Sequence, residues 1–258
     1  MDLELAGRTA VVTGASRGIG LAIVRALAAE GASVVAGSLH GSAELDRLGS
    51  VQSVLVDLST PEGPAELVST AVSGLGGIDI LVNNIGALKP RLDGFAAISD
   101  ADWEWSLSIN FLSAVRTMRA AIPAMAGRPG ATIVTVSSVN AFLPDPAVID
   151  YSAAKGALTN LCKSLSKELG PDIRVNTISP GPVMTDLWLG TDGVAATVGK
   201  AGGTDPDDVV AQQSAAAPSG RFTKPDEVAD LVLFLASSRA ANITGSDFVI
   251  DGGLITTL

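Results

Sequence analysis

Thr13-Gly14-Ala15-Ser16-Arg17-Gly18-Ile19-Gly20 is a glycine-rich turn between an apolar run and a helical pattern. The apolar run, Arg8–Thr13, predicts a first buried strand, and Gly18–Glu30 predicts the helix that follows it. Glycines here permit a tight turn and let the backbone approach a pyrophosphate, which then lies at the positive N-terminus of the helix. The spacing is G-x-x-x-G-x-G without the Lys-Ser/Thr ending of a P-loop. The turn therefore predicts a dinucleotide site and argues against an NTPase.

Short apolar runs alternate with helical patterns along the rest of the chain. The further expected strands are rich in Val and Ile, and they are Ser33–Gly37, Ser53–Val56, Ile78–Asn83, Ala131–Val136, Ile173–Ile178 and, ending a seventh, Phe248–Ile250. Helices are expected near 42–49, 61–74 and 100–126, and over the segment that carries Tyr151. Apolar strands without polar alternation are typical of parallel strands covered on both faces. The pattern predicts an α/β protein with a single-domain, doubly wound Rossmann fold: a seven-stranded parallel sheet with helices on both faces.

Composition excludes several classes of protein. The 258 residues carry a formal net charge of -10, which argues against binding to nucleic acid or to an anionic membrane surface. No apolar stretch is long enough for a membrane span, and Met1-Asp-Leu-Glu-Leu lacks the pattern of a signal peptide. The single cysteine, Cys162, falls in an apolar helical series and predicts a buried structural thiol in a reducing cytoplasm. The single histidine, His40, leaves no plausible zinc cluster.

Tyr151 and Lys155 stand four positions apart, so on a helix both side chains project from the same face. A free phenol has a pKa of ~10 and exchanges protons poorly near neutrality. A lysine cation beside it favours the phenolate, so we expect Lys155 to lower the pKa of Tyr151. The pair can then pass a proton to or from an oxygen. Ser138 follows the fifth expected strand, where a hydroxyl can hydrogen-bond a carbonyl oxygen.

Together these motifs resemble the short-chain dehydrogenase/reductase family. The matching pieces run in the family's order from residue 8 to about 252, and they are Thr13–Gly20, Asp57 in Val56-Asp57-Leu58, Asn83-Asn84-Ile85-Gly86, Asn110, Ser138, Tyr151 with Lys155, and Pro180-Gly181. The one small departure is Ile85, where the family usually has Ala, and it affects packing beside the ribose. The resemblance implies hydride transfer between a ketone and a secondary alcohol with NAD(H) or NADP(H), and no metal.

The resemblance also implies individual catalytic roles. Tyr151 donates or removes the proton, Ser138 stabilises the substrate oxygen, and Lys155 hydrogen-bonds the nicotinamide ribose. Asn110 anchors a water that links Lys155 to solvent, although an asparagine inside a helix would by itself be read as a solvated residue. Asp150, directly before the tyrosine, is interpreted as a helix cap or first-turn acid that points away from the site.

The expected cofactor contacts come from five loops and from the helix that carries Tyr151. Asp57 would bind the adenine, and Val183 and Thr185 the nicotinamide carboxamide. The complete set is Gly14, Ser16, Arg17, Gly18, Ile19, Gly20, Ser38, Asp57, Leu58, Asn83, Asn84, Gly86, Tyr151, Lys155, Pro180, Gly181, Val183 and Thr185.

Charge favours NADP(H) over NAD(H). An NAD site usually has an acidic residue after the second strand, and the stretch Ala36–His40 has none. Arg17 lies within reach of a 2′-phosphate, and Ser38 or His40 can add donors. The alternative for Arg17 is a solvated surface arginine.

Two further stretches of the sequence are expected to form the substrate pocket. Residues 181–222, rich in glycine, predict a mobile lid rather than a plain surface insertion. Val139–Pro144 and Leu187–Leu189 are expected to form mostly apolar walls, which suits an apolar ketone or alcohol. Trp188 is equally explained by core packing or an interface.

Other functions remain open. A 3-oxoacyl-acyl-carrier-protein reductase is the second choice, because its acidic partner would need a basic patch such as Arg116, Arg119 and Arg128. A non-catalytic nucleotide-binding regulator is the third, although the catalytic residues are all present. The resemblance further implies a homotetramer.

Overall fold

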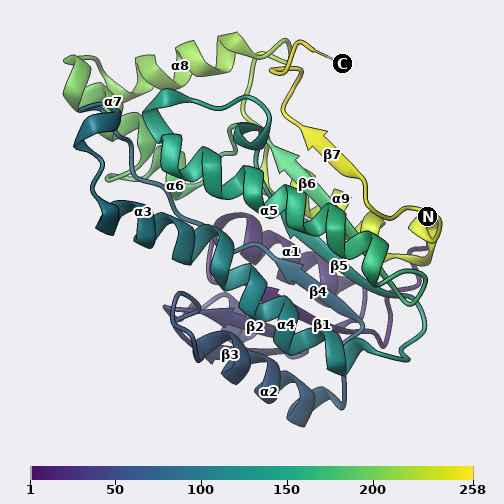
Figure 1. Ribbon diagram of the computed structural model, residues 1–258. Coiled ribbons are helices and arrows are strands. Elements are labelled where there is room, and N and C mark those ends of the chain that lie inside the picture. The colour runs from purple at the N-terminus through teal and green to yellow at the C-terminus, as the bar shows by residue number, and fades with distance from the viewer. Residues whose placement is uncertain (1, 258) are drawn as a thin grey trace.

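A seven-stranded parallel sheet organises the computed structural model, which describes residues 2–257. The strand order is β3-β2-β1-β4-β5-β6-β7 (Figure 1), and every neighbouring pair is parallel. The strands are β1 Thr9–Thr13, β2 Ser33–Ser38, β3 Val51–Leu55, β4 Ile80–Asn83, β5 Ala131–Val136, β6 Ile173–Pro180 and β7 Asp247–Ile250. The predicted doubly wound Rossmann fold is confirmed.

Helices cover both faces of the sheet because β1 is apolar on both sides. Val12 packs in a core cluster with α1 (Gly18–Ala29) and α9 (Pro225–Ala236). Val11, one residue earlier, packs in a second cluster on the opposite face. That cluster contains residues of α2 (Gly63–Leu75), α4 (Ser113–Met125) and α5 (Ile149–Glu168). Cys162 of α5 is buried in this second cluster, as predicted.

The helix predicted over 100–126 contains an irregular turn. It begins as α3 (Asp100–Leu107), passes through a π-helical turn at Ser108–Leu112 and continues as α4. Ser99 caps its start, since the Ser99 hydroxyl accepts from the Asp102 N–H and the Asp102 carboxylate accepts from the Ser99 N–H. A π-helical turn adds one residue to the helix and is common at functional sites.

One expectation about local structure needs correction. The helix expected near 42–49 is only a 3₁₀ turn at Leu45–Arg47, with Leu45 as its buried anchor between Gly41 and Gly49. Residues 181–222 include three short helices, α6 (Asp186–Leu189), α7 (Val194–Gly202) and α8 (Pro206–Ala216). Among residues 2–257, no helix has the length and apolar character needed to cross a membrane.

Candidate active site

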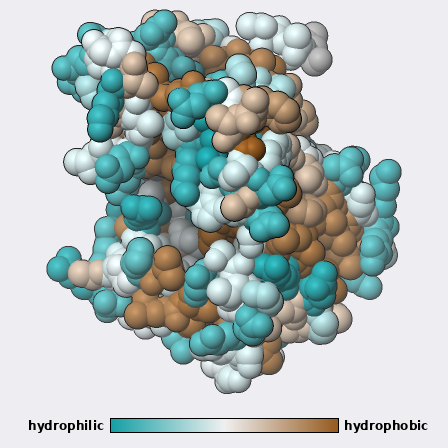
Figure 2. All heavy atoms as spheres, turned by 60° about the vertical axis from the view of Figure 1, so that its left-hand side comes forward, coloured by the Kyte–Doolittle hydropathy of each residue, from teal (hydrophilic) through white to brown (hydrophobic). Residues whose placement is uncertain are grey.

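A cavity of about 810 Å³ opens at the carboxyl edge of the sheet. β1 lies between β2 and β4, so the chain reverses its direction of strand addition there, and open α/β sheets bind ligands at this point. The cavity is lined by the glycine turn, by the residues after β2, β4, β5 and β6, and by the segment 181–222. Figure 2 views the molecule from the side of α3, α6 and α7, where apolar side chains lie among hydrophilic ones.

The glycine turn forms one end of the cavity. Gly14 and Gly18 have φ values of +64° and +55°, which L side chains rarely adopt. A Cβ on Gly20 would clash with the carbonyl oxygen of Gly14 and lie 2.6 Å from Asn84 Nδ2. The first turn of α1 carries no acidic residue, so the positive helix N-terminus is not neutralised there. These features suit an anionic pyrophosphate.

The glycine turn is joined to the end of β4. Asn84 Nδ2 donates to the carbonyl oxygens of Thr13 and Gly14, each at 3.2 Å, and the Thr13 hydroxyl accepts from the Asn84 N–H at 2.9 Å. These hydrogen bonds therefore fix the position of the glycine turn relative to the loop that follows β4.

Most of the predicted cofactor residues line this cavity. They are Gly14, Ser16, Arg17, Gly18, Ile19, Ser38, Asn84, Gly86, Tyr151, Lys155, Pro180, Gly181, Val183 and Thr185. Four others are not part of the lining, and of these Asp57 is exposed. Asp57 accepts hydrogen bonds from the hydroxyl and N–H of Ser59, which lower its pKa, and Leu58 is buried. Asn83 is buried, and its Nδ2 donates to the Thr135 hydroxyl at 3.4 Å. Gly20 is a buried residue in the first turn of α1.

The residues after β2 bring no carboxylate to the cavity. Ser38, Leu39 and His40 line it, and the Ser38 hydroxyl donates to the His40 carbonyl oxygen at 2.9 Å. Arg17 is largely exposed, with Nη1 3.9 Å from the Asp186 carboxylate of α6. Arg17 thus brings a cation to the cavity beside the glycine turn.

Ser138, Tyr151 and Lys155 line the same cavity. Lys155 is 2% exposed, and its Nζ donates to the Val136 carbonyl oxygen at 3.0 Å. The same nitrogen lies 5.6 Å from the centroid of the Tyr151 ring. The helix therefore brings amine and phenol to one face, as the spacing predicts. Ser138 contacts Asn140, donating to its Oδ1 and accepting from its N–H, both at 3.2 Å.

Asn110 lies in the π-helical turn and is buried, so it is not a solvated helix-face residue. Its Oδ1 accepts from the Ala87 N–H at 2.9 Å, and its Nδ2 donates to the carbonyl oxygens of Ala87 and Ser106 at 2.8 and 3.0 Å. A Cβ on Gly86 would lie 3.1 Å from Asn110 Oδ1 and 3.4 Å from Lys155 Nζ. The glycine thus permits close approach of the β4 loop to both residues.

The acid–base properties differ from the expectation for Tyr151. Removal of solvent raises the pKa of Tyr151 to about 12, and the Ser138 hydroxyl lowers it only in part. Burial lowers the pKa of Lys155 to about 8. The cost of burying the phenolate therefore dominates, and the expected lowering of the Tyr151 pKa by Lys155 is not found. At neutral pH the phenol is protonated, which suits donation to a carbonyl oxygen.

Comparisons with known proteins agree with this site. The family described as Enoyl-(Acyl carrier protein) reductase matches residues 14–255. L-xylulose reductase of Bos taurus is 38% identical, with 100% of each chain covered. The chain belongs to the short-chain dehydrogenase/reductase family. As a short-chain dehydrogenase/reductase, it is an oxidoreductase of a family that uses a nicotinamide cofactor.

Two further similarities cover the whole chain of this short-chain dehydrogenase/reductase. The 3-alpha-(or 20-beta)-hydroxysteroid dehydrogenase of Mycobacterium bovis is 35% identical over 100% of this chain and 93% of its own. L-sorbose reductase from Gluconobacter frateurii, in a crystal structure complexed with NADPH and L-sorbose, superposes with a TM-score of 0.91. It is 35% identical, and 100% of each chain is covered.

The walls beyond Tyr151 include more segments than the sequence indicates. Within the expected stretches, Val139, Asn140, Leu143, Pro144, Leu187 and Trp188 line the cavity, whereas Ala141, Phe142 and Leu189 do not. A 3₁₀ turn at Val139–Ala141 redirects the chain, and Phe142 is exposed. The β4–α3 loop adds lining residues that the sequence analysis did not indicate: Leu88, Pro90 and Leu92. The segment before α5 adds Pro146, Ala147 and Val148, and the expected lid segment adds Val194, Val198, Val209 and Gln213.

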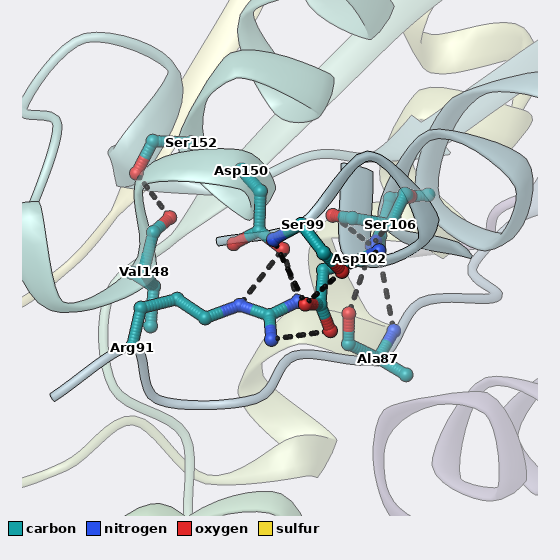
Figure 3. Close-up of polar contacts among 9 residues, drawn as sticks. Ala87, Arg91, Ser99, Asp102, Ser106, Val148, Asp150 and Ser152 are labelled. Carbon is teal, nitrogen blue, oxygen red and sulfur yellow. Dashed lines mark hydrogen bonds and ion pairs between the residues drawn. The ribbon is translucent and has the colours of Figure 1, made fainter. Parts of the chain in front are cut away.

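Asp150 lies in the first turn of α5, as expected, but it is buried and bonded to Arg91. Figure 3 shows the Arg91 guanidinium between the carboxylates of Asp150 and Asp102. Sequence reasoning missed Arg91, because 59 positions separate it from Asp150 and no motif connects them.

Tyr151 is the chain's single tyrosine, so alkaline titration reports its phenol alone. A pKa of about 12 means that little phenolate forms in the folded protein at pH 10.5. We expect below about a tenth ionised, against about three-quarters for a free phenol with a pKa of ~10. Ultraviolet difference absorbance measures this, with the protein in guanidinium chloride as the unfolded control. A midpoint near pH 10 in the folded protein would contradict the prediction.

Proposed function

We propose that this short-chain dehydrogenase/reductase interconverts an apolar ketone and its secondary alcohol, with Tyr151 as the acid–base group and NADP(H) as the preferred cofactor. One observation carries the proposal: the glycine turn and the trio Ser138, Tyr151 and Lys155 line a single cavity. A dinucleotide bound to the turn can thus extend toward a substrate oxygen held beside the phenol.

When bound, a nicotinamide dinucleotide supplies or accepts the hydride. In reduction, the Ser138 hydroxyl hydrogen-bonds the carbonyl oxygen and stabilises the negative charge that develops there. Tyr151 donates its proton to the same oxygen, and Lys155 keeps a positive charge near the phenol. Asn110 holds the Ala87 backbone through two hydrogen bonds, which fixes the loop that carries Gly86 beside Lys155.

The cofactor residues that line the cavity are proposed as direct contacts, and Gly20 is proposed to shape the turn. Asp57, Leu58 and Asn83 are not part of the lining. We propose that the exposed carboxylate of Asp57 hydrogen-bonds the adenine, with the neighbouring backbone of Leu58 helping, and that Asn83 supports the adenosine side. Arg17, Ser38 and His40 support the preference for a 2′-phosphate. The L-sorbose reductase that superposes on this chain was crystallised with NADPH.

The substrate is proposed to be apolar. The cavity lining includes Leu88, Leu92, Leu143, Trp188 and Val198, whose apolar side chains offer little to a charged group. Acyl carrier protein is a weaker choice, because the expected basic patch is dispersed. Arg128 binds Asp79 just before β4, at the opposite edge of the sheet, and Arg116 donates to the Ser59 carbonyl oxygen. A non-catalytic regulator would not need the complete catalytic set in one cavity.

A panel of apolar ketones, followed by the absorbance of the reduced nicotinamide, tests this proposal. We expect turnover with NADPH and a lower KM for NADPH than for NADH. Arg17→Ala removes the charge-assisted contact with the 2′-phosphate, worth about 1.5–3 kcal/mol, so KM for NADPH should rise about tenfold or more. The KM for NADH should stay within about twofold. A clear preference of the unmodified protein for NADH would contradict the cofactor assignment, and no turnover with any ketone would contradict the activity.

The chain is further proposed to act as a homotetramer in the cytoplasm. The support is its family membership and its single buried cysteine, which suits a reducing compartment. Light scattering coupled to size exclusion measures the assembly.

A further inference from the structure

Arg91 occupies the centre of a largely buried ionic cluster beside the active site. Its Nε and Nη2 donate to Asp150 Oδ2 at 3.1 and 2.6 Å, and its Nη1 donates to Asp102 Oδ1 at 2.8 Å (Figure 3). The side chains of Arg91 and Asp150 are 11% and 2% exposed. We call Arg91, Asp102 and Asp150 the Arg91 cluster.

The Arg91 cluster connects three elements that surround the cavity. Arg91 belongs to the loop between β4 and α3, Asp102 to α3, and Asp150 to the first turn of α5. In addition, the Arg91 N–H donates to the Ala147 carbonyl oxygen at 2.6 Å. Pro90 and Leu92 line the cavity on one side of this connection, and Ala147 and Val148 line it on the other. Arg91 therefore links the β4–α3 loop to the segment that precedes α5, and both segments line the cavity.

The cluster also controls the start of the helix that carries the phenol. α5 begins without a side-chain cap, because Val148 occupies the N-cap position. Asp150 precedes Tyr151 directly, and its Oδ1 is buried without a hydrogen-bond partner. A buried carboxylate is strongly unfavourable unless it is paired, so Arg91 supplies the charge that lets Asp150 remain inside. Loss of Arg91 would displace Asp150 toward water and move Tyr151 with it.

We propose that Arg91, acting through Asp150, is a positioning residue that sets where the Tyr151 hydroxyl meets the substrate oxygen. This inference rests on the proposed ketone–alcohol reaction. It adds a residue that never touches substrate, cofactor or the reacting atoms. A displacement of about 1 Å at a reacting group can slow turnover about a hundredfold, so even a small shift of the first turn of α5 matters.

Arg91→Met tests the proposal, with Arg25→Met as a matched control. Arg25 also bridges two carboxylates, Glu44 at 3.0 Å and Asp226 at 2.8 Å, but on an exposed surface outside the cavity lining. We expect Arg91→Met to lower kcat by about tenfold or more. The Kd for NADPH, measured by fluorescence titration, should stay within about twofold, because no Arg91 bond reaches the glycine turn. Arg25→Met should leave both values unchanged.

The double variant Arg91→Met with Asp150→Asn separates positioning from stability. It removes one positive and one negative charge, so no unpaired carboxylate remains at residue 150, and Tm should recover relative to Arg91→Met alone. We expect kcat to stay low, because the connection to the β4–α3 loop is still absent. If the double variant recovers kcat together with Tm, the proposal is overturned. It is likewise overturned if Arg91→Met alone has a normal kcat per NADPH-binding site.

A readout without turnover keeps this test separate from the proposed activity. In the charge-neutral double variant, a displaced Tyr151 meets more water, so alkaline titration of the single tyrosine should shift toward a pKa of ~10. An unshifted titration overturns the positioning role even if no ketone is turned over. Absence of turnover in the unmodified protein, with a shifted titration in the variant, contradicts the proposed reaction and supports the positioning role.

Discussion

Replacing Tyr151 with phenylalanine is expected to lower kcat for ketone reduction by about a thousandfold. The change removes only the hydroxyl that donates the proton, and general acid catalysis typically contributes about 10²- to 10⁴-fold. Ser138 and Lys155 remain at the cavity, so some stabilisation of the substrate oxygen persists. The measurement is single-turnover reduction at saturating NADPH, which excludes product release from the observed rate.

The control for Tyr151→Phe is cofactor binding. The Kd for NADPH should stay within about threefold, because the glycine turn is unaffected and the phenyl ring still fills its place. Tm should also be nearly unchanged. A variant that keeps more than a tenth of the original kcat would show that another group supplies the proton.

Gly20→Ala is expected to abolish tight NADPH binding and to destabilise the fold. The new methyl group would clash with the Gly14 carbonyl oxygen and lie 2.6 Å from Asn84 Nδ2, which itself bonds to the glycine turn. One contact is rigid backbone, so the turn must shift. Overpacking of this kind costs about 1–3 kcal/mol of folding free energy. We expect Tm to fall by about 5 °C, measured by calorimetry.

Gly49→Ala is the matched control for the Gly20 variant. Gly49 has no heavy atom within 4 Å of an added Cβ and has no positive φ. Its replacement should leave Tm and the Kd for NADPH unchanged. If Gly20→Ala binds NADPH within about threefold of the unmodified protein, the turn is not the pyrophosphate site that we propose.

Features encoded locally were predicted well from the sequence. The buried parallel strands follow from runs of Val and Ile, and the glycine turn follows from its place after β1. The spacing of Tyr151 and Lys155 correctly places both at one cavity, because the period of a helix fixes which side chains share a face. These inferences need only neighbouring residues.

Features that depend on distant contacts escaped sequence analysis. The π-helical turn that turns Asn110 toward the backbone of Ala87 has no periodic signal. The elevated pKa of Tyr151 reflects its burial in the folded protein, whereas the sequence shows only the nearby lysine. Arg91 meets Asp150 only after β4, α3 and α5 have assembled.

The segment 181–222 has a consequence for engineering. Helices α6, α7 and α8 come from one uninterrupted stretch between β6 and α9, and they contribute Leu187, Val198, Val209 and Gln213 to the cavity. None of the sheet's strand pairings involves that stretch. Exchanging it for the equivalent segment of a homologue would therefore replace one wall of the cavity without changing the register of any strand. Libraries for altered substrate range can concentrate there.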